Sequence, residues 1–239
     1  MKYLLLLLAL ALALSSAAHA TQFEIIKEHS KVGFEVDYMM MTKVEGHFTK
    51  YQGFFELNDK EDEISKVRVE VYSDSVDSND KKRDFHLKGH EFLFAVNHPE
   101  ITFKATGPAK IGADKKFKIT GELTLRKVTK TVTFEGEFKG KGKDPWGKDS
   151  FFYNLKSEIN RKDFEITWNQ QMDTGGYLVG DIVRLSIVVQ AQRMADKTPF
   201  STHMIPATKG IIERQDLKSG RIKKLTTPTD PKDQSAPKK

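Results

Sequence analysis

Residues 116–138 read KFKITGELTLRKVTKTVTFEGEF, and their alternation decides the fold class. In the first half, Ile119 and Leu123 alternate with lysine, threonine and glutamate, and Val132 and Phe134 do the same in the second half. A period of two with one charged face is typical of a β-strand that is covered on one side only. The stretch therefore predicts two neighbouring strands that share one apolar face, as in an antiparallel sheet.

The same rhythm continues along most of the chain. Segments of this kind lie near residues 22–28, 30–39, 44–57, 64–73, 100–106, 116–126, 130–141, 150–159 and 177–191. Turn signals such as Asn58-Asp59 separate them, and no amphipathic helix of about 10–15 residues lies between successive strands. These roughly eight to ten strands predict an all-β protein. Its antiparallel sheet is expected to close into a barrel, because closure removes the unpaired edges.

One long connection interrupts the rhythm. Residues 74–99 begin with polar side chains and then carry several aromatic and aliphatic ones. They predict a short helix at about 81–88, followed by a loop that lays its aromatic side chains over the barrel. Long loops in compact domains are often functional lids, so this segment is expected to act as one.

A barrel of such strands would have a long, narrow interior. Strands of about 12 residues, tilted by about 40°, make a barrel roughly 30 Å tall. Inward glycines such as Gly53, Gly121 and Gly136 are expected to leave room inside it. The sequence therefore predicts a tunnel that holds one long apolar molecule, with a barrel packed solid by its own side chains as the alternative. The predicted tunnel lining consists of Phe34, Val36, Tyr38, Phe48, Phe55, Val67, Val69, Val71, Phe92, Phe94, Phe103, Leu123, Leu125, Phe134, Phe138, Leu185 and Ile187.

The two ends of the chain differ from its centre. Lys2, the apolar run 4–14 and Ala18-His19-Ala20 match a secretory signal peptide, which predicts cleavage after Ala20 and export. Residues 193–239 contain eleven basic and five acidic side chains, whereas residues 21–192 contain 27 basic and 28 acidic ones. The basic charge thus lies in a proline-containing tail that is expected to be largely disordered and flexible. Its placement argues against nucleic acid as a partner and leaves a weak contact with anionic surfaces as the tail's candidate role.

Several segments, in this order, resemble the YceI family. They are Glu28–Phe34 (EHSKVGF), Val44–Phe48 (VEGHF), Arg83–Leu87 (RDFHL), His98–Phe103 (HPEITF), Gly121–Leu125 (GELTL), Asp144–Gly147 (DPWG), Ile159–Phe164 (INRKDF) and Val179–Val183 (VGDIV). The resemblance covers about residues 22–192. It implies three parts: a signal peptide (1–20), a YceI-like lipid-binding barrel (21–192) and the basic tail (193–239).

The resemblance also implies a fold and a function. The fold would be an extended eight-stranded, lipocalin-like antiparallel barrel with a central apolar tunnel. The ligand would be a polyisoprenoid, an isoprenoid quinone or a fatty amide, held in the periplasm for transport, storage or stress protection. No cofactor other than such a bound lipid is implied. The oligomeric state stays open, with a dimer as one option.

Five polar residues are candidates for contacts with a ligand head group, namely Arg83, Asp84, His86, Asn160 and Arg161. Arginine can fork onto a phosphate; a structural hydrogen-bond network is the alternative reading. His86, His90 and His98 do not carry a metal prediction, because their spacing alone is weak support. The chain has no cysteine, no G-x-S-x-G motif and no phosphate-binding loop, so no enzyme activity is predicted.

Two other interpretations and two local features complete the expectations. An outer-membrane barrel would also alternate, but with apolar residues outward and charges in the lumen. An interaction or structural protein would combine a packed barrel with a functional basic tail. Met39-Met40-Met41 are expected either to adapt to a variable ligand or to pack in the core, and Trp146 is expected to pack on a turn.

Overall fold

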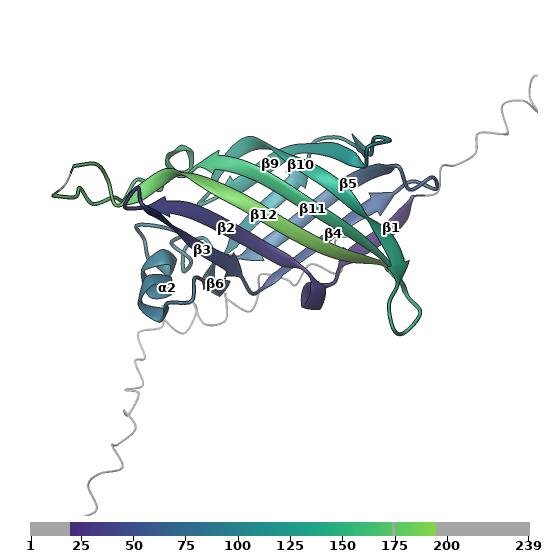
Figure 1. Cartoon of the computed structure of the whole chain (residues 1–239), viewed down its shortest axis with the longest axis horizontal. Helices are drawn as coiled ribbons and strands as arrows, with labels where there is room; N and C mark the ends of the chain where they lie inside the picture. Colours follow the sequence, from purple (N-terminus) through teal and green to yellow (C-terminus); the bar gives the residue numbers. More distant parts are fainter. Residues whose placement is uncertain (1–19, 174, 195–239) are drawn as a thin grey trace, which may run out of the picture. The chain divides into compact units, whose positions relative to one another are not determined.

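Twelve β-strands and one short α-helix form the described part of the chain, residues 20–173 and 175–194 of a computed structural model (Figure 1). The strands are β1 (Thr21–Ile25), β2 (Lys31–Tyr38), β3 (Thr42–Phe48), β4 (Tyr51–Leu57), β5 (Glu63–Tyr72), β6 (Val76–Asp77), β7 (Glu100–Ala105), β8 (Ala109–Lys110), β9 (Lys116–Leu125), β10 (Val128–Lys143), β11 (Asp149–Asn160) and β12 (Val179–Arg193). The predicted signal peptide, apart from Ala20, and the tail beyond residue 194 lie outside the described residues.

The strands form one closed antiparallel barrel. Neighbours follow the order β1, β4, β5, β7, β9, β10, β11 and β12, and β12 pairs back onto β1. The first pairing sets Phe23 opposite Phe55, and the closing one sets Phe23 opposite Arg193. The predicted all-β barrel of eight antiparallel strands is confirmed, and its closure leaves no long unpaired edge around this ring.

Two of the eight barrel strands are broken in the middle. The first consists of β1 and β2, separated by a 3₁₀ helix at Lys27–His29, and both halves pair with β12. The second consists of β3 and β4, whereas the sequence predicted one unbroken strand over 44–57. At the break, the backbone N–H groups of the connecting residues donate to Ser75 instead of to a neighbouring strand. The Thr49 N–H donates to the Ser75 carbonyl at 3.0 Å, and the Lys50 N–H donates to the Ser75 hydroxyl at 3.1 Å.

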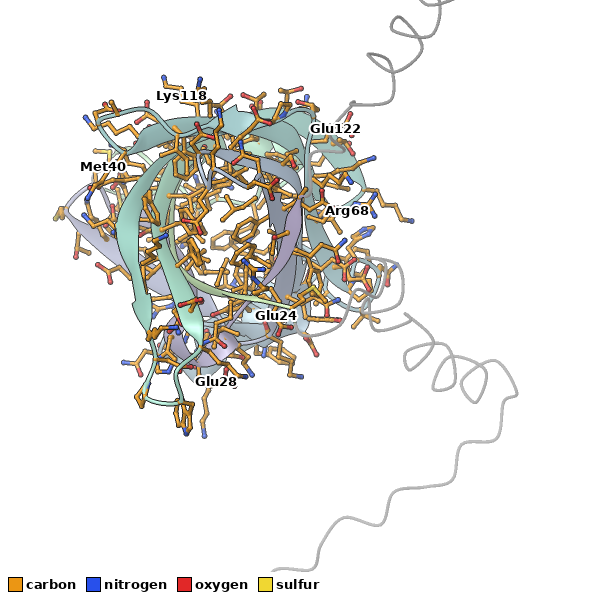
Figure 2. All side chains as sticks on the ribbon, turned by 90° about the vertical axis from the view of Figure 1, so that its right-hand side faces the viewer. Glu24, Glu28, Met40, Arg68, Lys118 and Glu122 are labelled. Atoms are coloured by element: carbon orange, nitrogen blue, oxygen red, sulfur yellow. The ribbon has the colours of Figure 1, made fainter. Side chains whose placement is uncertain are left out.

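The alternation seen in the sequence separates inside from outside. Along β9, every second side chain from Phe117 to Leu125 is buried, and the residues between them are mostly exposed. The register then sets Ile119 opposite Phe134 on β10, which brings two apolar side chains together on the inner face. Figure 2 shows the charged side chains of Arg68, Lys118 and Glu122 on the outside of the barrel wall.

The long connection between β6 and β7 contains the helix that the sequence predicted. Helix α2 spans Lys81–Lys88, and the Asp80 carboxylate caps it by accepting hydrogen bonds from the N–H groups of Lys82 (2.9 Å) and Arg83 (3.0 Å). The helix lies at one end of the barrel (Figure 1). No helix within residues 20–173 and 175–194 is long and apolar enough to span a bilayer.

Candidate ligand-binding cavity

The inner faces of the strands enclose a cavity of about 1030 Å³. Its wall is built mainly from valine, leucine, isoleucine and phenylalanine side chains of β2, β5, β7, β9 and β12. Many of these residues, among them Val36, Val69 and Leu185, are only partly buried although they face inward. They keep accessible surface because they border open space, so a barrel packed solid is wrong for this protein.

The predicted tunnel lining agrees with the cavity wall at all but two positions. Every predicted lining residue except Phe94 and Phe138 borders the cavity; that these side chains contact a ligand stays a prediction. Phe94 has a positive φ of 49°, and its ring packs against His90 and His98 (centroids 6.5 and 5.5 Å away) instead of facing inward. Phe138 lies beyond the floor of the cavity, where its ring packs on Tyr153 at 5.3 Å.

Aromatic rings close one end of the cavity. Phe55, Phe117 and Tyr153 form its floor. The ring centroid of Tyr153 lies 5.8 Å from that of Phe55 and 6.0 Å from that of Phe117. Behind them, Phe23 stacks on Phe55 at 5.5 Å and meets Phe151 edge-on at 4.9 Å. The Tyr153 hydroxyl is uncharged at neutral pH, and burial raises its pKa further above the ordinary value, with nearby Glu61 adding to the rise.

The inward glycines serve the wall, contrary to the expectation that they leave room for a ligand. A Cβ on Gly136 would lie 2.2 Å from a ring carbon of Phe117, and one on Gly121 would lie 2.6 Å from the ring of Phe103. Gly53 is similarly covered by the side chain of Ile25. Each glycine lets a larger neighbour lie flat against the strand, and these three do not border the cavity.

The opposite end, at α2, carries nearly all charged and histidine side chains of the cavity. Apart from Arg161, all acidic, basic and histidine side chains of the lining belong to residues 80–91. Most exposed lining residues are also found there, namely Asp80, Lys82, Phe85 and His90, whereas Val188 is exposed midway along β12. We therefore call the α2 end the mouth of the cavity.

The segment after α2 covers the mouth only in part. Leu87, Phe92 and Leu93 border the cavity, as predicted for a lid, but Phe85 is 82% exposed. His86 joins α2 to the segment after it and to the loop that precedes β12: its Nε2 lies 2.6 Å from a Glu91 carboxylate oxygen, and its ring meets the Trp168 ring edge-on at 4.9 Å.

The head-group candidates divide into two groups. Arg83 and His86 border the mouth, and within the described residues Arg83 donates from its Nε and from one Nη2 hydrogen, both to Ser78 (2.8 and 2.6 Å). Its remaining N–H donors have no partner among those residues and can face a ligand. Asp84 and Asn160 do not border the cavity: Asp84 accepts from the Ser78 N–H at 2.8 Å, and Asn160 caps the short helix Arg161–Phe164 by accepting from the Lys162 N–H at 3.0 Å.

Arg161 borders the cavity, but the protein engages its whole guanidinium. It donates from Nε to the Gly180 carbonyl (2.9 Å) and from Nη1 to the Ile166 and Trp168 carbonyls (both 2.8 Å). Nη2 donates to the Val179 carbonyl (3.4 Å) and to Asp181 (3.2 Å). Burial lowers the pKa of Arg161 and Asp181 opposes that change. With all five donors used, this geometry favours the structural role over a head-group contact.

Sequence reasoning missed some of the wall. Phe117 and Ile119 follow the alternation of 116–125 and could have been included on that pattern. Trp168 lies in an irregular loop that is held near the mouth by a hydrogen bond from Arg161 to the Trp168 carbonyl. No sequence pattern predicts its position in the cavity wall. Among the described residues, no group of three or more His, Cys, Asp or Glu side chains is placed to hold a metal ion.

The outer-membrane interpretation is wrong, because the charged and apolar faces of the barrel are the opposite of those it requires. Such a barrel needs an apolar outer band, because charged side chains facing lipid are destabilising. Here the outer face carries ion pairs, including Lys118–Glu135 at 3.4 Å, and the apolar side chains point inward.

A closed antiparallel barrel with one apolar cavity and a polar mouth defines the class of lipocalin-like barrels. Within that class, this chain belongs to the YceI family: the family model for the YceI-like domain matches residues 23–191. The chain is 37% identical over 162 residues to Protein YceI of Salmonella newport (strain SL254), covering 67% of this chain and 84% of that protein. The family that the sequence motifs indicated is thus confirmed.

Solved structures share this fold. The crystal structure of the Campylobacter jejuni YCEI protein is 28% identical, with a TM-score of 0.57 over 66% of this chain and 90% of that one. A polyisoprenoid-binding domain from Saccharophagus degradans has a TM-score of 0.52 over 74% of this chain and all of that domain. At 8% identity, the likeness to that domain concerns the fold alone.

Proposed function

We propose that this protein binds one long apolar ligand, with the chain of the ligand in the cavity and its polar end at the mouth beside Arg83. The ligand class is a polyisoprenoid, an isoprenoid quinone or a fatty amide. The observation that carries the proposal is a large apolar cavity that is closed by aromatic rings at one end and polar at the other. Membership of the YceI family and the fold shared with a polyisoprenoid-binding domain support it.

The size of the cavity supports a ligand of this length. Taking about 30 Å³ per water-sized group, a volume of about 1030 Å³ holds on the order of 30 non-hydrogen atoms. That corresponds to roughly six isoprene units. Each buried methylene contributes about 0.8 kcal/mol, so ten of them supply about 8 kcal/mol before the ordering costs of binding. Affinity would come from length and burial, with few polar contacts.

The proposed setting is the periplasm, where the protein acts in transport, storage or stress protection without catalysing a reaction. The signal-peptide pattern of residues 1–20 supports export. The uncharged floor and the lack of a nucleophile motif fit a binding role.

The experiment is native mass spectrometry with lipid extraction, on protein purified from its own periplasm and on protein offered a hexaprenyl phosphate, a six-isoprene quinone and a C22 amide. Leu185→Trp and Val69→Trp each place a larger side chain in the cavity and are expected to abolish uptake of the ligands. Ser186→Trp is the matched control, because Ser186 is exposed on the outer face of the same strand as Leu185. If the unchanged protein takes up none of the three ligands, the proposal fails.

A further inference from the structure

Large apolar side chains are exposed at the same end of the barrel as the cavity mouth. Met40 (74% exposed) and Met41 (78%) form the tip of the β2–β3 hairpin, and Tyr177 (60%) precedes β12. Phe85 on α2 and Val96 in the following loop are exposed as well. In Figure 1 the β2–β3 hairpin, the start of β12 and α2 all lie at this end. We call these five residues the mouth surface. The sequence predicted Met40 and Met41 either in the core or against a ligand, but both are exposed on the outside.

The hairpin tip carries methionine where the backbone favours other residues. Met39 and Met40 have φ values of 55° and 57°, and the Met41 N–H donates to the Tyr38 carbonyl at 3.2 Å. The three methionines form the loop between Tyr38 and Thr42, and within it residues 38–41 make a β-turn whose two central residues are left-handed, a conformation that favours Asn and Gly. Places where a sequence breaks a local rule without a packing gain are expected at functional sites. Met40 and Met41 remain 74% and 78% exposed, so the turn gains little burial and is unlike one selected for stability.

The mouth surface is continuous with the cavity. Phe85 borders the cavity itself, and so do Tyr38 and Leu178, which flank the hairpin tip and Tyr177 in sequence. A hydrogen bond of 2.8 Å from the Met39 N–H to the Leu178 carbonyl holds these two segments together. An apolar ligand that leaves by the mouth therefore passes these side chains.

Unpaired cations accompany the apolar side chains. Lys81, Lys82 and Lys88 on α2 form no ion pair within 4.0 Å with a described residue. The acidic groups of the same segment are engaged: Asp80 caps the helix, Asp84 binds Ser78, and Glu91 pairs with His86. Exposed apolar residues beside free lysines are the combination that binds the interface of an anionic bilayer.

We propose that the mouth surface docks on a lipid bilayer, with Met40, Met41 and Phe85 at the level of the lipid head groups and the α2 lysines against lipid phosphates. The ligand then passes between bilayer and cavity without crossing water. The role of docking in ligand transfer rests on the proposed function, but the docking itself can be measured on protein without ligand.

The test compares full-chain variants that all keep the basic tail. Ligand-free protein is floated with phosphatidylethanolamine–phosphatidylglycerol vesicles, and transfer of a six-isoprene quinone from loaded protein to such vesicles is timed. Met40→Ser combined with Met41→Ser and Tyr177→Ser is expected to lower both flotation and transfer rate about tenfold, because all three side chains are exposed and none borders the cavity. Trp146→Ser is the matched control, because Trp146 is equally exposed (79%) but lies on the β10–β11 hairpin. Lys81→Gln combined with Lys88→Gln, neither of which borders the cavity, is expected to weaken flotation on these vesicles more than on neutral phosphatidylcholine vesicles.

The outcomes separate docking from ligand binding. Reduced flotation and transfer in the mouth variants, with unchanged quinone retention in solution, supports the proposal. Equal losses with Trp146→Ser, or wild-type behaviour of the mouth variants, overturns it and leaves a protein partner or free diffusion as the delivery route. If the unchanged protein retains no quinone but its flotation still depends on the mouth surface, the proposed ligand fails and the docking surface stands.

Discussion

Replacing Arg161 is the sharpest test of how the mouth is held together. Arg161→Ala removes five donors that join the loop carrying Ile166 and Trp168 to the start of β12 at Val179 and Gly180. A buried carbonyl left without a partner costs about 1–3 kcal/mol, and a hydrogen bond that water can replace costs about 0.5–1.5 kcal/mol. Of the four carbonyls, only that of Ile166 belongs to a buried residue.

The expected destabilisation follows from that division. One buried carbonyl and three partly exposed ones give a loss of roughly 3–7 kcal/mol in the free energy of unfolding. For a domain of this size that lowers the melting temperature by roughly 10–20 °C. Arg161→Lys keeps the charge but not the planar fork, so it is expected to lose about half as much.

The assay is urea unfolding followed by the fluorescence of Trp168 in a Trp146→Phe background, which leaves one tryptophan near the mouth. Lipid capture by the folded variant is measured in parallel. A loss below about 0.5 kcal/mol, within the range of ordinary surface substitutions, would refute the structural role. A stable variant that no longer captures lipid would identify Arg161 as a head-group contact after all.

Three further predictions concern the wall, the floor and the outer face. Gly136→Ala is expected to destabilise by about 1–3 kcal/mol, because its Cβ would lie 2.2 Å from the Phe117 ring. The control Gly142→Ala, with nothing within 4 Å, is expected to change stability by less than about 0.5 kcal/mol, and equal effects in urea unfolding would contradict this account. Tyr153→Phe is expected to leave stability unchanged or raise it by about 1 kcal/mol, since the Tyr153 hydroxyl is buried without a partner among the described residues; a clear loss would reveal an unseen hydrogen bond. The hydrogen bond from Arg184 holds the pKa of Asp37 below its ordinary 3.8, so the pair's stabilising effect is complete above that pH and is lost as pH falls through the lowered pKa. Arg184→Gln is expected to raise the Asp37 pKa toward 3.8 in an NMR titration, and an unchanged value would show that Arg184 is not the cause.

The sequence by itself determined the features that depend on near neighbours. Strand faces follow from a period of two, so the inward set from Ile119 to Leu125 could be predicted without coordinates. Helix α2 was predictable because a capping aspartate, Asp80, stands directly before it. The family motifs added the strand number, which the alternation alone left at about eight to ten.

The tertiary structure decided what depends on distant residues. A void is the difference between the space that the closed strands enclose and the volume of all inward side chains, so no single segment could predict it. The same holds for Phe138, which follows the inward pattern of β10 but lies beyond the aromatic floor, and for Phe94, whose left-handed backbone in the loop after α2 accompanies packing on His90 and His98. The donors of Arg161 were committed by carbonyls up to 19 residues away in the chain. Local periodicity sets the direction of a side chain, but only packing sets what that side chain meets.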